Sequence, residues 1–126
     1  MKRQIIQPPG MPSNRVLSHG VRVGDFIWTA GAIGRDPVTG AMPEDIRGQT
    51  RQALSNVRAV LEAGGSSLAS VVKVNIYLTE ITLRDAVNEV YLEFFPSEQP
   101  GRTAIGGAQF AAGVLVEIEA VAVVES

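Results

Sequence analysis

The chain has 126 residues, which is enough for one core, so we expect a single domain over residues 1–126. Apolar residues make up 45% and charged residues 19%, which is typical of a folded protein. A formal net charge of −2 without a basic stripe argues against a nucleic-acid partner, and the lack of cysteine excludes disulfides and thiolate chemistry. With no apolar leader and no run of about 20 apolar residues, the sequence favours a cytoplasmic protein that does not engage a membrane.

The first third of the chain predicts a loop followed by strands. Three prolines and a glycine between residues 8 and 14 disfavour regular structure. From Arg15 to Ile33 the alternation of side chains predicts strands, with a hairpin turn at residues 23–25. Residues 36–40, DPVTG, have the chemistry of a second turn.

Residues 44–63 predict a helix, because apolar and small side chains recur with a period of 3.6 residues. The acidic Glu44 and Asp45 near its start suit the helix dipole, and Gly64-Gly65 is expected to end it with a left-handed cap. The predicted core stripe consists of Ile46, Thr50, Ala53, Leu54, Val57, Val60 and Leu61.

The second half predicts a strand, a helix and two further strands. Residues 70–79 alternate as a strand, with Val72, Val74, Ile76 and Leu78 on one face. Residues 83–94 predict a helix with Thr82 as its N-cap. Its apolar stripe is Leu83, Ala86, Val87, Val90, Tyr91, Phe94 and Phe95. Residues 102–108 and 114–124 predict a final pair of strands, joined by a turn at residues 109–113.

The expected order is therefore β-β-β-α-β-α-β-β, an α+β fold in which two helices pack on one face of a single mixed sheet. The last strand is apolar on both faces apart from Glu117 and Glu119. A sheet that is covered by helices on one side does not need a second apolar face. We therefore expect that face to be buried in a subunit interface.

Several kinds of catalytic site are absent from the sequence. The one histidine, His19, cannot form a histidine-based metal site, so no metal is expected. There is no phosphate-binding loop, dinucleotide-binding motif or nucleophile elbow. His19 could act as a base, but its position at the start of a strand favours an ordinary hydrogen-bonding role.

Charged side chains on two of the predicted strands are candidates for ligand binding or catalysis. Arg102 opens a strand of small residues, and a guanidinium binds a carboxylate through two parallel hydrogen bonds; the alternative is a surface arginine at a sheet edge. Glu117 and Glu119 share one face of the last strand. A carboxylate in an apolar setting can transfer protons near neutrality, whereas a solvated or ion-paired one would have no such role.

Short motifs along the chain recur in the order and spacing of a known family. They include Gly24-Asp25-Phe26, Thr29-Ala30-Gly31, residues 36–40, 54–57 and 61–68, Val87–Tyr91, Pro100-Gly101-Arg102-Thr103 and residues 116–122. Through these motifs the chain resembles the RidA/YjgF family of enamine/imine deaminases over nearly its whole length.

The resemblance implies a chorismate-mutase-like fold and a homotrimer with sites in the clefts between subunits. It also implies hydrolysis of reactive 2-enamino or 2-imino acids to 2-keto acids and ammonia, without a cofactor or metal. By the same resemblance, Arg102 holds the carboxylate of a small substrate and Glu117 positions the hydrolytic water. Gly31 and Ala104 match backbone contacts to the ligand, and Asn88 matches a residue near the site.

The chain departs from the family pattern around this site. Leu17 replaces a usual tyrosine, Ala30 and Ala32 replace a serine and a glutamine, and Ala104 replaces a frequent cysteine. Leu17 and Ala30 therefore stand at substrate-binding positions with apolar side chains, which suggests a different acid as substrate, either bulkier or more apolar. The departures also leave open a non-catalytic, carboxylate-binding regulatory trimer. An endoribonuclease or translation inhibitor, an activity of some family members, is disfavoured by the acidic balance of charge.

The expected register gives one geometric prediction. A tight hairpin centred near Ala111 would place Arg102 opposite Ala120 and Glu117 opposite Ile105. Arg102 and Glu117 would then point to opposite faces of the sheet and could meet only across a subunit boundary, unless a bulge reverses the parity.

Overall fold

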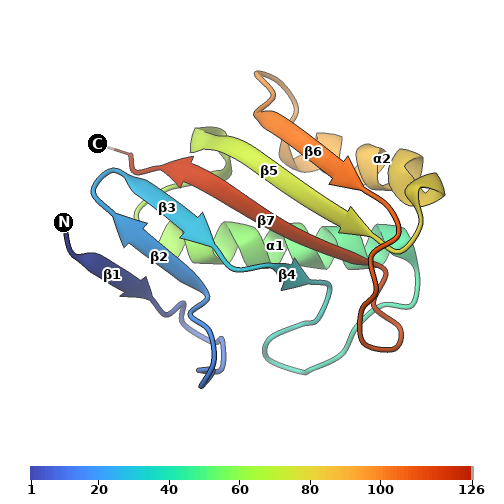
Figure 1. The fold of residues 1–126 in the computed structure, drawn as a ribbon, viewed down its shortest axis with the longest axis horizontal. Coiled ribbons are helices and arrows are strands. Elements are labelled where there is room, and N and C mark those ends of the chain that lie inside the picture. Colours follow the sequence, from blue (N-terminus) through green and yellow to red (C-terminus); the bar gives the residue numbers. More distant parts are fainter. Residues whose placement is uncertain (126) are drawn as a thin grey trace.

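The computed structural model describes residues 1–125 as a sheet backed by two helices (Figure 1). The helices are α1 (Ile46–Ala63) and α2 (Arg84–Phe94), and single 3₁₀ turns cover Leu68–Ser70 and Ile81–Leu83. The strands are β1 (Arg3–Ile6), β2 (Gly20–Val23), β3 (Phe26–Thr29), β4 (Ala32–Ile33), β5 (Val71–Leu78), β6 (Gly101–Ile105) and β7 (Val116–Val123).

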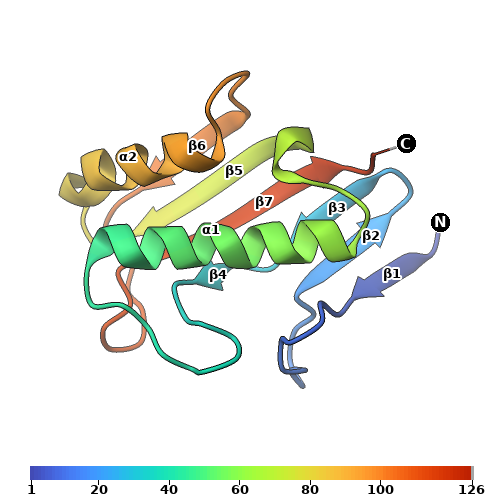
Figure 2. The ribbon, with the colours of Figure 1, turned by 180° about the vertical axis from the view of Figure 1, so that it is seen from behind.

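The strands form one mixed sheet in the order β1-β2-β3-β7-β5-β6, and β4 pairs with β7 beyond the end of β3. The β5–β6 pair is parallel and the other pairs are antiparallel. Figure 2 shows α1 and α2 side by side on the same face of the sheet. The predicted α+β fold class, with both helices on one face of a mixed sheet, is confirmed.

The core lies between this face and the helices. The stripe predicted for the first helix is buried from Thr50 to Leu61, while Ile46 is only partly buried. It packs against inward-facing residues of β3, β5 and β7. Each fully buried aliphatic side chain contributes roughly 1.5–3 kcal/mol, so these contacts dominate the stability of the layer. The largest fully buried apolar residues are Ile27, Leu54, Leu61, Ile76, Leu78 and Ile118.

The expected hairpin between the last two strands is wrong. β6 and β7 do not pair; β5 lies between them, parallel to β6 and antiparallel to β7. The chain enters β6 through α2, so β6 takes the free edge of β5 as its parallel neighbour. Val74 of β5 thus lies between Arg102 and Ala120, which were expected to pair directly.

Three local predictions also need correction. Residues 3–6 form the edge strand β1, so four strands rather than three precede α1. An irregularity in register after Val71 puts Val71 in the core and leaves Val72 46% exposed, not on the face of Val74 as expected. Thr82 is not an N-cap, because α2 continues directly from a 3₁₀ turn and its N-cap position is Leu83. By contrast, Asp45 caps α1 by accepting from Gly48 N at 2.9 Å.

One buried polar side chain, in the first turn of α1, links the loop before α1 to the loop before β7. The amide nitrogen of Gln49 donates to the carbonyls of Pro43 (2.9 Å) and Gly113 (2.8 Å), and its oxygen accepts from Leu115 N (2.9 Å). Gly34 packs on the backbone of Gln49 so closely that a Cβ there would lie 2.6 Å from the carbonyl oxygen. Within residues 1–125, no helix is both long and apolar enough to cross a membrane.

Candidate active site

Arg102 lies at the edge of the sheet, beneath α2. It pairs with Val74, whose side chain is buried by the helices, so Arg102 also points to the helix side of the sheet. Its guanidinium carbon lies 4.8 Å from the centre of the Tyr91 ring of α2. The two side chains line a pocket of about 310 Å³, together with Asn88, Leu92, Gln99 and Pro100.

The pocket presents a cation and unused polar atoms. The two ion pairs found among residues 1–125 are Arg47–Glu89 and Arg51–Glu93, so neither engages Arg102. Across the same residues, Asn88 Oδ1 and the Tyr91 hydroxyl are the buried side-chain polar atoms that lack a hydrogen-bond partner. Burial raises the pKa of Tyr91 despite the opposing effect of Arg102, so this phenol stays neutral near pH 7. A neutral, apolar wall behind an unpaired guanidinium suits an anionic ligand.

Glu117 lies on the opposite, uncovered face of the sheet. It pairs with Tyr77 of β5 and Ile33 of β4, and it is half-buried. Gly31 packs directly on its carboxylate, because a Cβ at position 31 would lie 2.7 Å from Glu117 Cδ. The expected separation of Arg102 and Glu117 onto opposite faces is therefore confirmed, although the expected hairpin that led to it is wrong.

Polar side chains surround Glu117 on the uncovered face. Asn75 Nδ2 donates to Glu119 Oε2 at 3.3 Å, so the second glutamate has a partner within the chain. Partial burial, followed by the nearby carboxylates of Glu119 and Glu117, raises the pKa of Tyr77. Tyr77 is thus a neutral hydroxyl next to two carboxylates, a group able to donate a hydrogen bond near pH 7.

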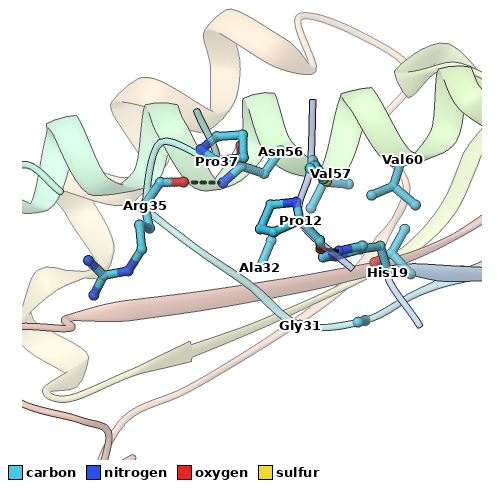
Figure 3. A pocket seen from close by; sticks show the side chains of 12 residues that line it. Pro12, His19, Gly31, Ala32, Arg35, Pro37, Asn56, Val57 and Val60 are labelled. Atoms are coloured by element: carbon cyan, nitrogen blue, oxygen red, sulfur yellow. Dashed lines mark hydrogen bonds between the residues drawn. The ribbon is translucent and has the colours of Figure 1, made fainter. Parts of the chain in front are cut away.

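A second pocket of about 160 Å³ lies behind Gly31, between the N-terminal loop and α1 (Figure 3). Ala30 and Ala32 line it, and its polar side chains are hydrogen-bonded within the chain. His19 Nε2 is 2.7 Å from the carbonyl oxygen of Pro12, which agrees with the expected structural role of His19. Asn56 Nδ2 donates to the carbonyl oxygen of Arg35 at 2.8 Å, the bond drawn in Figure 3.

The residues matched to the family site thus fall into separate groups within one chain. Arg102 and Asn88 share the pocket under α2, and Ala104, two residues along β6, packs against the core. Gly31 and Glu117 are in contact on the far side of the sheet, and Ala30 lines the cavity behind Gly31. Leu17 lies in a third hollow, on the loop between β1 and β2, with 45% of its surface exposed.

Two residues near these groups were not singled out from the sequence. Tyr91 was assigned to the apolar stripe of the second helix, and Tyr77 lies in the strand predicted over residues 70–79, on the face opposite Ile76 and Leu78. The available signal was the spacing of Asn88 and Tyr91, which places both side chains on one face of a helix. Over residues 1–125 no group of three or more carboxylate or histidine side chains is arranged to hold a metal ion.

Comparison with known proteins identifies the family of the chain. Residues 11–124 match the model of the endoribonuclease L-PSP family. A 2-iminobutanoate/2-iminopropanoate deaminase of Dermatophagoides farinae is 38% identical over 125 residues, which cover 98% of each chain. The chain belongs to the RidA/YjgF (endoribonuclease L-PSP) family.

Other members of the RidA/YjgF family support the assignment. A RutC family protein of Pyrococcus horikoshii is 43% identical over 83% of this chain and 84% of its own. The crystal structure of Escherichia coli TdcF with bound serine superposes with a TM-score of 0.89 at 32% identity, covering 97% of this chain and 99% of the other. Relatives at 36–38% identity are named as deaminases of 2-imino acids, which supports a deaminase class for this chain.

Proposed function

We propose that this chain is a cytoplasmic deaminase that hydrolyses small 2-imino and 2-enamino acids to 2-keto acids and ammonia. The observation that carries the proposal is the Arg102 guanidinium, which lies over Tyr91 in a pocket of about 310 Å³ and takes part in neither of the two ion pairs among residues 1–125. A guanidinium in this setting binds a carboxylate through two parallel hydrogen bonds. The names of the relatives supply the reaction class.

In the proposed reaction Arg102 binds the carboxylate of the 2-imino acid, to which an enamine has first tautomerised. The Glu117 carboxylate accepts a proton from a water molecule as its oxygen bonds to C2. The electrons of the C=N bond move to nitrogen, which takes up a proton. The hydroxyl proton of the resulting carbinolamine then passes to the nitrogen. As the C=O bond forms the C–N bond breaks, so ammonia leaves and the 2-keto acid remains. No metal or cofactor takes part.

We further infer that the site is completed in a homotrimer. Arg102 and Glu117 are on opposite faces of the sheet, so one chain does not present both to the same small molecule. The uncovered face also carries Phe26 and Trp28, which are 43% and 45% exposed, with their ring centres 6.0 Å apart. An apolar patch of this kind marks an interface. In the proposed trimer, the Arg102 pocket of one subunit faces Gly31 and Glu117 of the partner subunit.

A second candidate function is favoured by one observation. Ala30 and Ala32 make the pocket wall behind Gly31 apolar, at positions where the family pattern has polar side chains. A site without those groups could bind a carboxylate through Arg102 and not turn it over, as a regulatory trimer would. An endoribonuclease activity is disfavoured, because a net charge of −2 offers little attraction for RNA phosphates.

The test of deaminase function follows the decay of 2-iminobutanoate that a pyridoxal-phosphate enzyme releases. Semicarbazide traps the remaining imine as a semicarbazone. We expect the purified protein to lower the semicarbazone yield in proportion to its concentration, as an active family member does in parallel. A yield unchanged by the protein would contradict the deaminase proposal. Calorimetric binding of 2-oxobutanoate without turnover would then favour the regulatory alternative.

A further inference from the structure

Tyr91 is held between Arg102 and the core. Its ring stacks on Phe95 with the ring centres 4.6 Å apart and an interplanar angle of 27°. The Arg102 guanidinium lies above Tyr91, 4.8 Å from the ring centre. Tyr91 is 3% exposed and Phe95 4% exposed, so neighbouring core side chains restrain both rings. The Arg102 guanidinium thus lies over an aromatic ring whose orientation is fixed by core packing.

An aromatic ring and a carboxylate hold an arginine side chain in different ways. The face of the ring attracts the cation through its quadrupole and leaves the N–H groups of the guanidinium free. A carboxylate partner would instead occupy two of the donors that a ligand needs. Because burial raises the pKa of Tyr91, its hydroxyl carries no negative charge that would compete for Arg102.

We propose that Tyr91 is a positioning residue, whose ring orients the Arg102 guanidinium for two-point binding of the substrate carboxylate. This inference rests on the proposed carboxylate-binding role of Arg102. The ring acts and the hydroxyl does not: the Tyr91 hydroxyl is buried without a hydrogen-bond partner among residues 1–125, so its removal costs no bond within the chain.

The effect is expected on binding and not on the chemical step. Arg102 holds the carboxylate equally in the bound substrate and in the transition state, so loss of its orientation raises KM and leaves kcat nearly unchanged. A cation–aromatic contact at a half-buried site corresponds to about a 2- to 30-fold change in affinity. We expect Tyr91→Met and Tyr91→Leu to weaken binding within that range, and Tyr91→Phe to bind like the wild type.

Phe94 provides a matched control on the same helix. Arg58 lies over the Phe94 ring at 5.4 Å, and neither residue lines the Arg102 pocket. Phe94→Leu therefore removes an arginine–aromatic contact and partly buried aromatic surface without touching the proposed site. A general loss of packing would affect Phe94→Leu and Tyr91→Met alike, whereas a positioning role affects only Tyr91→Met.

The experiment measures the dissociation constant of 2-oxobutanoate by calorimetry for the five proteins, with thermal unfolding in parallel. Weaker binding by Tyr91→Met, with wild-type affinity in Tyr91→Phe and Phe94→Leu, is the expected result. Wild-type affinity in Tyr91→Met, or equal weakening in Phe94→Leu, would overturn the proposal. If the Tyr91→Leu protein unfolds, Tyr91→Met decides the outcome, because the flexible, unbranched side chain of methionine fills a cavity more readily. Because binding is read without turnover, Tyr91-dependent binding by a protein that lacks deaminase activity would refute the proposed reaction and support the positioning role.

Discussion

Replacement of Arg102 by alanine is expected to lower kcat/KM for 2-iminobutanoate by about 10²- to 10⁴-fold. Each hydrogen bond to a charged group contributes about 1.5–3 kcal/mol, and alanine removes two of them. At about 1.4 kcal/mol per tenfold change, the loss spans that range. Arg102→Lys keeps the charge but not the planar fork, so a smaller loss of about 10- to 100-fold is expected. The semicarbazone assay, run at several enzyme concentrations, measures both.

Arg58→Lys is the control for this series. Arg58 also lies over an aromatic ring of α2, but away from the pocket that holds Arg102. Its replacement should leave kcat/KM within about twofold of the wild type, since surface substitutions seldom change a distant site. An Arg102→Ala protein that retains wild-type kcat/KM and wild-type thermal stability would exclude Arg102 as the carboxylate anchor.

Trp28→Glu is expected to convert the proposed trimer into monomers and to abolish deaminase activity with it. In the isolated chain Trp28 is 45% exposed and adjoins Phe26 on the uncovered face, so the change should leave the fold intact. In the assembly, three carboxylates would be buried among apolar side chains without partners, at a cost of several kcal/mol each. Sedimentation velocity measures the change in mass.

Val38→Glu is the matched control for the interface. Val38 is an apolar side chain, 80% exposed, in the loop between β4 and α1, so it belongs to none of the strands that form the uncovered face. The same substitution there should leave the assembly and the activity unchanged. A Trp28→Glu protein that sediments with the same mass as the wild type would show that this face is not the subunit interface.

The parts of the fold that were predicted correctly depend on strong periodic patterns. The stripe from Thr50 to Leu61 predicted a buried helix face. The alternation in the last strand placed Glu117 and Glu119 on one face, which is opposite the buried residues of β7. The separation of Arg102 from Glu117 also followed from alternation. This prediction is correct although the hairpin is wrong, because β5 lies between the two strands and Val74 is in register with both Arg102 and Ala120.

The errors arose where tertiary contacts override local pattern. Residues 3–6, RQII, are too few to show the alternation of a strand, yet they form β1 by pairing with β2. A single irregularity in β5 exchanges the positions of Val71 and Val72, and no residue type marks it. Two of the three hydrogen bonds of Gln49 link residues more than 60 positions apart along the chain, which no short-range pattern reveals.

The candidate site was identified from the sequence only in part. Arg102 and Glu117 were candidates by residue type and position, and the family resemblance supplied their roles and added Gly31. The structure brings Gly31 onto Glu117 within one chain. Tyr91 was predicted only as a core residue, because an aromatic residue that contacts an arginine has the same helical spacing in the sequence as any buried aromatic residue. Its role depends on the neighbour at 4.8 Å, which the sequence places eleven positions away on another element.

In the proposed trimer, each active site combines Arg102 of one subunit with Glu117 of another. The most direct test co-expresses Arg102→Ala and Glu117→Gln chains under separate affinity tags and isolates the mixed assemblies. It is run at a substrate concentration at which each variant alone shows little activity. In each cyclic trimer that contains both chains, about one in three interfaces joins an intact Arg102 to an intact Glu117. Deaminase activity near a third of the wild-type value per chain is the predicted result. Mixed assemblies that contain both chains and are no more active than either variant alone would contradict the account.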